Sequence, residues 1–271
     1  MSNVASKCKA QTASLRSAMA DFDDVSVRRA LANVFSNDAK ISMCYPFGEL
    51  SGPNDFYEGV YGQLLNAIQD LERRELIVLA GTTPEGQDWV GMMGNYMGTF
   101  TSPFLDIPPT GHLVHMRFHE FYRLESGRVT EVQAIWDIPE LMMQANAWPL
   151  APQLGKFMAT PGPMTQDGLT ATGDGIVTMN HVIKMLTDLC KFPSNPDPKI
   201  MNLEHYWHPK NNWYGRQVLA PTAVLMDSDI GIRSLFCVGC QIENWTQWVI
   251  CYRIGLLRVI MFVKQVGQIC G

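Results

Sequence analysis

Apolar residues in the first half of the chain recur first at a helical spacing and then at a strand spacing. A short amphipathic helix is predicted over residues 8–21. Val27 and Leu31 stand one helical turn apart in DDVSVRRALANVF, which predicts a second helix with Ser26 as its cap. The segment SGPNDFYEGVYGQLLNAIQDL predicts a third helix, because Pro53 is suited to a first helical turn.

The segments that follow have strand lengths and strand alternation. Strands are predicted for KISMCYPF, RELIVLAG, DWVGMMGNYMGTF, HLVHMRFHEFYRL and RVTEVQAIWD. The turn ESGR joins the last two, and IPELMMQANAWPL closes the unit. Helices followed by a long antiparallel sheet predict an α+β domain over residues 1–152.

A second, incomplete copy of this domain is predicted further along the chain. Residues 153–174 are rich in Gly, Pro and Thr and are interpreted as a linker before the helical segment IVTMNHVIKMLTDLCKF. PKIMNLEHYWHPKNNWYG then resembles VRRALANVFSNDAKISM, with His208 in the place of Ser36, an offset of 172. Residues 175–215 are therefore interpreted as the start of a repeat.

Residues 216–271 lose this resemblance, and we interpret them as a frameshifted translation. The pair Met226–Asp227 fixes a shifted codon for Gly, and Trp245–Thr246 fixes one for Asp. The shifted reading of VIMFVKQVGQIC permits DYVCETGWPDM, which resembles DWVGMMGNYMG. That earlier segment begins at Asp88, and adding the offset of 172 gives 260, where the shifted match begins. The tail is thus expected to stop part-way through the repeat.

Two other interpretations of the tail are weaker. The apolar stretch WVICYRIGLLRVIMFV is short for a membrane span and contains Arg253 and Arg258. The motif CVGC, with Cys237 and Cys240, is half of a zinc site without a second pair. We therefore expect no metal, no cofactor and no membrane partner.

Composition and charge narrow the class of protein. The 271 residues are 46% hydrophobic and 17% charged, as in a globular protein. A net charge of −5 and a pI near 5.7 argue against a nucleic-acid partner. The first residues lack the apolar core of a secretory signal, and the seven cysteines are unevenly spread. Reduced thiols and a cytoplasmic location are expected.

The hairpin from His112 to Asp137 carries the candidate chemistry. Strand alternation places Glu120 on the same face as the aromatic and methionine side chains, where desolvation is expected to raise its pKa and make it a general acid or base. The alternative, which we favour, is that Glu120 accepts a hydrogen bond from a buried donor or lies at a solvated end of the sheet. The side chains expected to line a substrate pocket around it are Tyr96, Met116, Phe118, Tyr122 and Trp136.

Other polar residues of the hairpin allow two interpretations each. Asp137 is a candidate second acid, but it also precedes PELMMQ, where it would cap a helix, and we favour the cap. His115, Arg117, His119 and Arg123 share the opposite strand face, where they would hold an anion or, as we favour, form a solvated or interface face.

The segment GHLVHMRFHEFYRLESGRVTEVQAIWDIPELMMQ resembles the SnoaL-like polyketide cyclases. The resemblance extends over about residues 25–150 and over the start of the second copy as far as HPKNNWYG. It implies the α+β cone of the nuclear transport factor 2-like superfamily, a curved antiparallel sheet around helices, here in tandem. It also implies that sheet faces pair, as an internal pseudo-dimer or a homodimer.

The resemblance further implies an intramolecular aldol closure driven by a histidine and an aspartate. These positions fall on Glu120 and Ala134, so both residues depart from the family pattern. The expected function is proton transfer or cyclisation on an apolar carbonyl compound, with Glu120 as acid and base and Asp137 assisting. The alternative is a binding or dimerisation module without catalysis.

Overall fold

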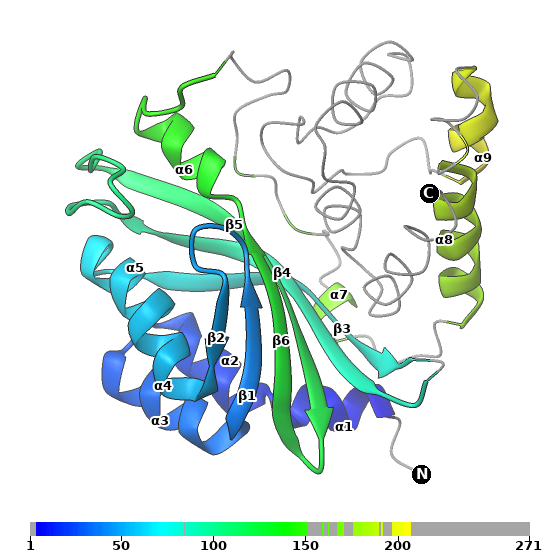
Figure 1. The fold of residues 1–271 in the computed structure, drawn as a ribbon, viewed down its shortest axis with the longest axis horizontal. Coiled ribbons are helices and arrows are strands. Elements are labelled where there is room, and N and C mark those ends of the chain that lie inside the picture. Colours follow the sequence, from blue (N-terminus) through cyan, green and yellow to red (C-terminus); the bar gives the residue numbers. More distant parts are fainter. Residues whose placement is uncertain are drawn as a thin grey trace. The chain divides into compact units, whose positions relative to one another are not determined.

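The computed structural model describes residues 4–83, 85–150, 159, 162, 167–170, 176–189, 191 and 197–206 (Figure 1). The chain divides into two compact units. The first consists of Met1–Pro152 and Pro161–Thr172, and the second of Gln153–Thr160 and Gly173–Gly271.

The first unit contains the predicted helices and strands. Its helices are α1 (Val4–Gln11), α2 (Ala13–Ala20), α3 (Asp24–Val34), α4 (Gly52–Phe56), α5 (Gly62–Ala67), α6 (Ile138–Gln144) and α7 (Asp167–Thr170), with a π-helical turn, η1 (Tyr57–Tyr61), between α4 and α5. Its strands are β1 (Phe35–Met43), β2 (Glu49–Ser51), β3 (Glu72–Thr82), β4 (Asp88–Thr99), β5 (Leu113–Glu125) and β6 (Arg128–Trp136). Four of the five predicted strands coincide with β3, β4, β5 and β6. The first, KISMCYPF, is confirmed only over residues 40–43, because β1 begins earlier, at Phe35, and ends at Met43. The short β2 is an addition.

The strands form one strongly curved sheet in the order β2-β1-β6-β5-β4-β3 (Figure 1). Strands β3 to β6 form an antiparallel meander, and β2 pairs antiparallel with β1. Strand β1, however, runs parallel to β6, so the sheet is mixed and not wholly antiparallel as expected. The reason is that β1 reaches the rest of the sheet through the helical connection α4–α5, and such a connection permits parallel pairing where a tight hairpin does not.

Helices cover one face of this sheet, and together they enclose the interior that we call the cone. Val27 and Leu31 of α3 are buried in the same apolar cluster as Met92 and Tyr96 of β4. Helix α3 begins one turn earlier than predicted, because Asp23 is its cap and accepts a hydrogen bond from the Ser26 amide at 2.8 Å. The expected capping role of the Ser26 side chain is therefore wrong.

Strands β3 and β4, at one edge of the sheet, approach each other closely around Gly94. The pairing shifts between Glu75 and Ile77, which forms a bulge opposite Gly94. A Cβ atom on Gly94 would lie 2.0 Å from the carbonyl oxygen of Arg74. Only glycine fits here without a shift of the backbone, and the bulge fixes where the neighbouring side chains of β3 enter the cone.

Residues 153–174, predicted as a linker, include α7, which packs against β3 in the first unit. The Lys9 ammonium group donates a hydrogen bond to the Leu169 carbonyl at 2.9 Å. In the second unit, α8 (Ile176–Leu189) confirms the predicted helix, and it is followed by η3 (Pro198–Met201) and α9 (Leu203–Tyr206). The proposed frameshifted tail, residues 216–271, lies outside the described residues.

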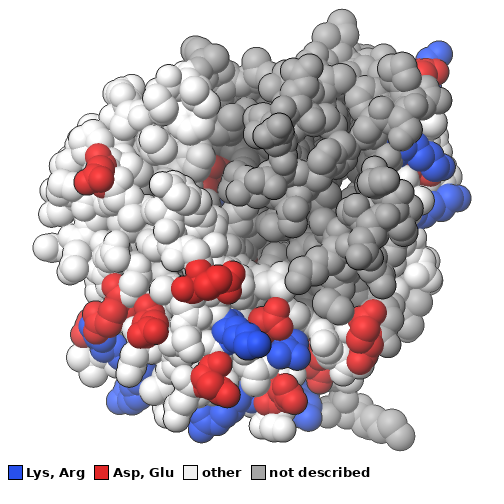
Figure 2. All heavy atoms as spheres, in the orientation of Figure 1, with Lys and Arg blue, Asp and Glu red and all other residues white. Residues whose placement is uncertain are grey.

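Acidic and basic side chains lie intermixed over the lower part of the face shown in Figure 2. Within the described ranges, no helix is long and apolar enough to cross a membrane.

Candidate functional site

The Glu120 carboxylate lies inside the cone and contacts several hydrogen-bond donors. Its Oε1 atom accepts hydrogen bonds from the Tyr96 hydroxyl at 2.7 Å and the Trp136 indole at 3.0 Å. Its Oε2 atom accepts from the Tyr122 hydroxyl at 2.8 Å and from Arg73 Nη2 at 3.1 Å. Glu120 itself is 0% exposed. Each carboxylate oxygen thus accepts two of these hydrogen bonds. The sequence alternative, a glutamate that accepts from buried donors, is therefore present in the structure.

A further hydroxyl reaches Glu120 from the helical side of the cone. The Tyr61 hydroxyl lies 3.4 Å from each Glu120 oxygen and 3.3 Å from the Tyr122 hydroxyl. Tyr61 is the last residue of the π-helical turn η1, whose first residue, Tyr57, donates to Asp24 of α3. π-Helical turns are rare and occur often at functional sites. The turn therefore directs the Tyr57 hydroxyl towards Asp24 of α3 and the Tyr61 hydroxyl towards Glu120.

The three buried hydroxyls remain protonated because of their surroundings. Burial, followed by the negative charge of Glu120, raises the pKa of Tyr61, Tyr96 and Tyr122 well above the ordinary value. The hydroxyls are therefore hydrogen-bond donors at neutral pH and not bases.

A chain of alternating charges extends from Glu120 to the surface. Arg73 of β3 donates to Glu120 through Nη2 and to Glu75 through Nη1. Glu75 in turn accepts from Arg16 of α2 at 2.6 Å. Burial acts to raise the pKa of Glu75, but the charges of Arg73 and Arg16 outweigh it and hold that pKa below its ordinary value. The two arginines and two glutamates together are formally neutral.

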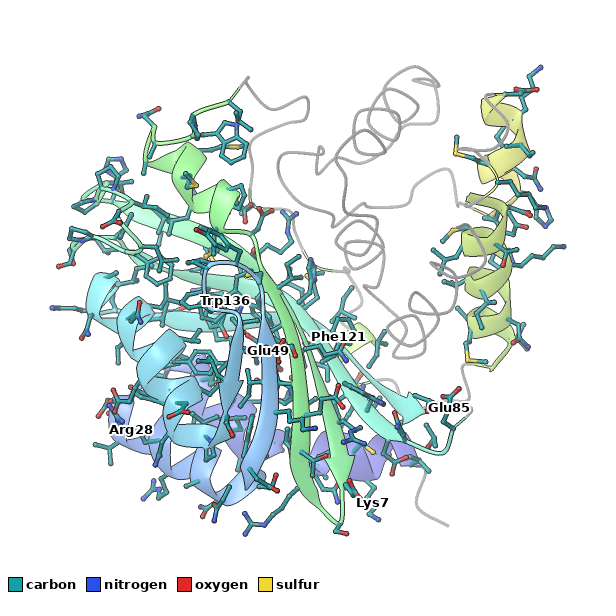
Figure 3. All side chains as sticks on the ribbon, in the orientation of Figure 1. Lys7, Arg28, Glu49, Glu85, Phe121 and Trp136 are labelled. Atoms are coloured by element: carbon teal, nitrogen blue, oxygen red, sulfur yellow. The ribbon has the colours of Figure 1, made fainter. Side chains whose placement is uncertain are left out.

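The predicted lining residues surround this polar centre. Phe118 lies 4.8 Å from the Tyr96 ring centroid, and its ring faces the Arg73 guanidinium at 4.1 Å. Met116 is buried and pairs with Tyr96 across β4 and β5. Trp136 lies under the turn between β1 and β2, where the Phe47 ring packs on it at 5.8 Å (Figure 3).

Asp137 takes the capping role that the sequence favoured. Its side chain accepts a hydrogen bond from the Glu140 amide at 3.3 Å, at the start of α6. The opposite face of β5 is not solvated as expected, since Arg117 and His119 are buried. Arg117 finds its counter-ion in Glu140, whose carboxylate lies 3.4 Å from Nη2 and also accepts from the Arg117 amide at 2.7 Å.

Two contacts of Glu120 escaped the sequence analysis. Arg73 stands in the charged run ERRE, which reads as a solvated strand end, and its pairing with Tyr96 depends on a register with a bulge. Tyr61 falls within a predicted helix. The π-helical turn that directs its side chain towards Glu120 has no sequence pattern that distinguishes it from an α-helix. Among the described residues there is no group of three or more His, Cys, Asp or Glu side chains arranged to hold a metal ion.

Residues 13–145 match the family model of the SnoaL-like polyketide cyclases. They form a SnoaL-like domain. The α+β fold with a curved sheet around helices, expected from the resemblance, is confirmed for this SnoaL-like domain. The histidine and aspartate positions implied by the resemblance fall on Glu120 and Ala134, which are direct partners across β5 and β6.

Solved structures with similar chains include AclR from Streptomyces galilaeus, at 19% identity over 55% of this chain and 91% of that chain, with a TM-score of 0.44. A SnoaL-like protein from Jannaschia sp. CCS1 is 20% identical over 55% of this chain and 98% of that one, with a TM-score of 0.45. IdmH from Streptomyces antibioticus is 19% identical over 51% and 96%, with a TM-score of 0.42. No curated protein matches the sequence.

Proposed function

We propose that the SnoaL-like domain is a small-molecule enzyme that transfers a proton on an apolar carbonyl compound, with Glu120 as base and then as acid. The observation that supports this most is a fully buried carboxylate held by two phenol hydroxyls and an indole. Apolar walls exclude water, and the donors fix the carboxylate in one orientation.

The step needs no co-reactant. The Glu120 carboxylate removes a proton from the carbon next to the substrate carbonyl, and the C–H electron pair forms the enolate. The enolate carbon then attacks a second carbonyl of the same molecule, and Glu120 returns its proton to the resulting alkoxide. A new C–C bond forms and the product is an isomer of the substrate. If the second carbonyl is absent, return of the proton to carbon gives isomerisation or exchange.

Access to Glu120 requires a covering side chain to move, because the residues around the carboxylate are buried. Phe47 is the best candidate, since it is partly exposed on a short turn and rests on Trp136. The neighbouring Tyr45 is 87% exposed, and a side chain at Gly48 would meet open space. We propose that a flat apolar substrate replaces the Phe47 ring against Trp136.

The proposal can be tested with 2-tetralone, an apolar bicyclic ketone with an acidic C–H beside its carbonyl. Deuterium incorporation from D₂O, followed by proton NMR, measures proton abstraction without knowledge of the natural substrate. Wild-type protein is expected to exchange this position faster than buffer alone. The substitution Glu120→Gln is expected to lower the rate at least about 100-fold, because an amide cannot accept the proton.

Glu140→Gln is the matched control. Glu140 is another wholly buried glutamate paired with an arginine, but its partners lie on the opposite face of β5. It is expected to keep the wild-type exchange rate per folded molecule, as measured by circular dichroism. Equal rates for wild type and Glu120→Gln would remove Glu120 from the mechanism.

The second candidate is a binding module without turnover. It is favoured by the departure of Glu120 and Ala134 from the family's acid–base pair, and by the number of donors already bound to Glu120. Binding of 2-tetralone with exchange no faster than in buffer would support it.

A further inference from the structure

The Arg73 Nε–H group lies in the cone and lacks a hydrogen-bond acceptor among the described residues. Arg73 itself is 2% exposed. An unsatisfied buried donor is costly, and more so when it carries charge. The group therefore needs an acceptor from outside the described residues, and it belongs to the guanidinium that also binds Glu120.

The guanidinium is held firmly in place. Nη1 binds Glu75, Nη2 binds Glu120, and the Phe118 ring packs against its flat face. Because the guanidinium is rigid and planar, these contacts also fix the direction of the Nε–H bond. Gly94 and the bulge on β3 set the position of the strand segment that carries Arg73 and Glu75. A donor fixed in advance is the kind of group that stabilises developing negative charge.

Charge balance indicates what the acceptor is. The network of Arg16, Glu75, Arg73 and Glu120 is formally neutral while Glu120 is ionised. When Glu120 takes a proton, one positive charge is left without compensation. The enolate formed in the same step carries one negative charge on its oxygen and restores neutrality.

We propose that Arg73 is a second catalytic residue, whose Nε–H donates to the substrate carbonyl oxygen and stabilises the negative charge that develops there. This inference rests on the proposed function and adds the chemical class of ligand, a carbonyl or enolate oxygen. The two residues then have different roles: Glu120 transfers the proton, and Arg73 stabilises the negative charge that develops on the substrate oxygen.

Wild-type protein tests the donor directly with two naphthalenes of nearly equal shape. 2-Methoxynaphthalene has an ether oxygen that accepts but cannot donate, whereas 2-ethylnaphthalene has a methylene group in its place. Titration followed by naphthalene fluorescence is expected to show about tenfold tighter binding of the methoxy compound. Equal affinities would overturn the proposal, as would failure of the methoxy compound to bind up to its solubility limit.

Arg73→Lys assigns the preference to this residue, because lysine keeps the positive charge and lacks the Nε–H group. The substitution is expected to remove the preference for the methoxy compound. In the 2-tetralone exchange it should raise KM about tenfold, because the ground-state carbonyl loses the same hydrogen bond, and lower kcat about 100-fold, because the enolate oxygen loses a stronger one. Arg117→Lys, at another buried arginine paired with a glutamate, is the matched control and should change neither value.

Failure of this inference can be told apart from failure of the proposed function. A methoxy preference that survives Arg73→Lys, or Arg73→Lys that exchanges 2-tetralone as fast as wild type, would overturn the role of Arg73 while leaving Glu120 as the base. A preference lost in Arg73→Lys without any exchange by wild type would establish the donor and refute proton abstraction. Should Arg73→Lys fail to fold, the comparison of the two naphthalenes on wild type still decides whether the donor exists.

Discussion

Gly94 lies where β3 and β4 approach most closely, and Gly94→Ala should be strongly destabilising. The added methyl carbon would lie 2.0 Å from the Arg74 carbonyl oxygen and 2.9 Å from the Glu75 Cα atom. Both neighbours are backbone atoms, so no side-chain rotation can relieve the contact. The carbonyl would have to withdraw by about 1 Å to reach the 3.0 Å below which such contacts are essentially never seen.

The expected loss of unfolding free energy is about 2–4 kcal/mol. Overpacking costs about 1–3 kcal/mol in well-packed interiors, and each backbone hydrogen bond weakened on β3 adds about 1 kcal/mol. The movement also carries Arg73 and Glu75 away from Glu120. The exchange activity should therefore fall in the fraction that remains folded.

Urea unfolding followed by circular dichroism measures the loss, and Gly81→Ala is the matched control. Gly81 lies on the neighbouring strand β3, and a Cβ atom there would meet nothing within 4 Å. Its substitution should change the unfolding free energy by less than about 0.5 kcal/mol. A Gly94→Ala protein within about 0.5 kcal/mol of wild type would show that β3 adapts freely, and would refute the argument that the bulge fixes Arg73.

Three further predictions concern other parts of the chain. Phe47→Ala should lower KM for 2-tetralone or raise kcat/KM about threefold or more, because the ring that covers Trp136 is removed. Unchanged KM and kcat/KM would show that the substrate reaches Glu120 by another route. The depressed pKa of Glu75 means that its ionised form contributes stability above its unfolded pKa of about 4.3, and that this is lost as pH falls through the folded pKa. Glu75→Gln should thus show a flatter decline in melting temperature from about pH 5 to pH 3, and a decline as steep as that of wild type would contradict this assignment. Resequencing the DNA across the Gly215 codon should reveal one additional base that restores the repeat, whereas an unchanged sequence would reject the frameshift.

The sequence predicted those parts of the fold that depend on local pattern. Alternation in HLVHMRFHEFYRL placed Glu120 in the interior and beside Trp136, because a strand's faces follow from residue parity alone. The cap at Asp137 could also be predicted, because capping depends only on the residues that immediately follow it in the sequence. Asp23 was missed as a cap because the start of a helix can move by a turn without changing its apolar face.

The remainder of the site depends on contacts between distant segments. Arg73 reaches Glu120 only because a bulge realigns β3 against β4, and Tyr61 reaches it only through a π-helical turn. Neither irregularity follows from apolar spacing. The parallel pairing of β1 with β6 could not be predicted from apolar spacing either, because it joins strands that are separated in sequence by most of the domain.

The π-helical turn has a consequence for insertions and deletions during evolution. A π turn holds one residue more than an α-helical turn, so loss of a single residue from Tyr57–Tyr61 could leave a regular helix. That change would rotate one flank relative to the other by about 100°. Either Tyr57 would turn away from Asp24, or Tyr61 would turn away from Glu120. The two tyrosine contacts therefore depend on the number of residues in this helix as well as on their identity, and relatives that keep both contacts should keep its length.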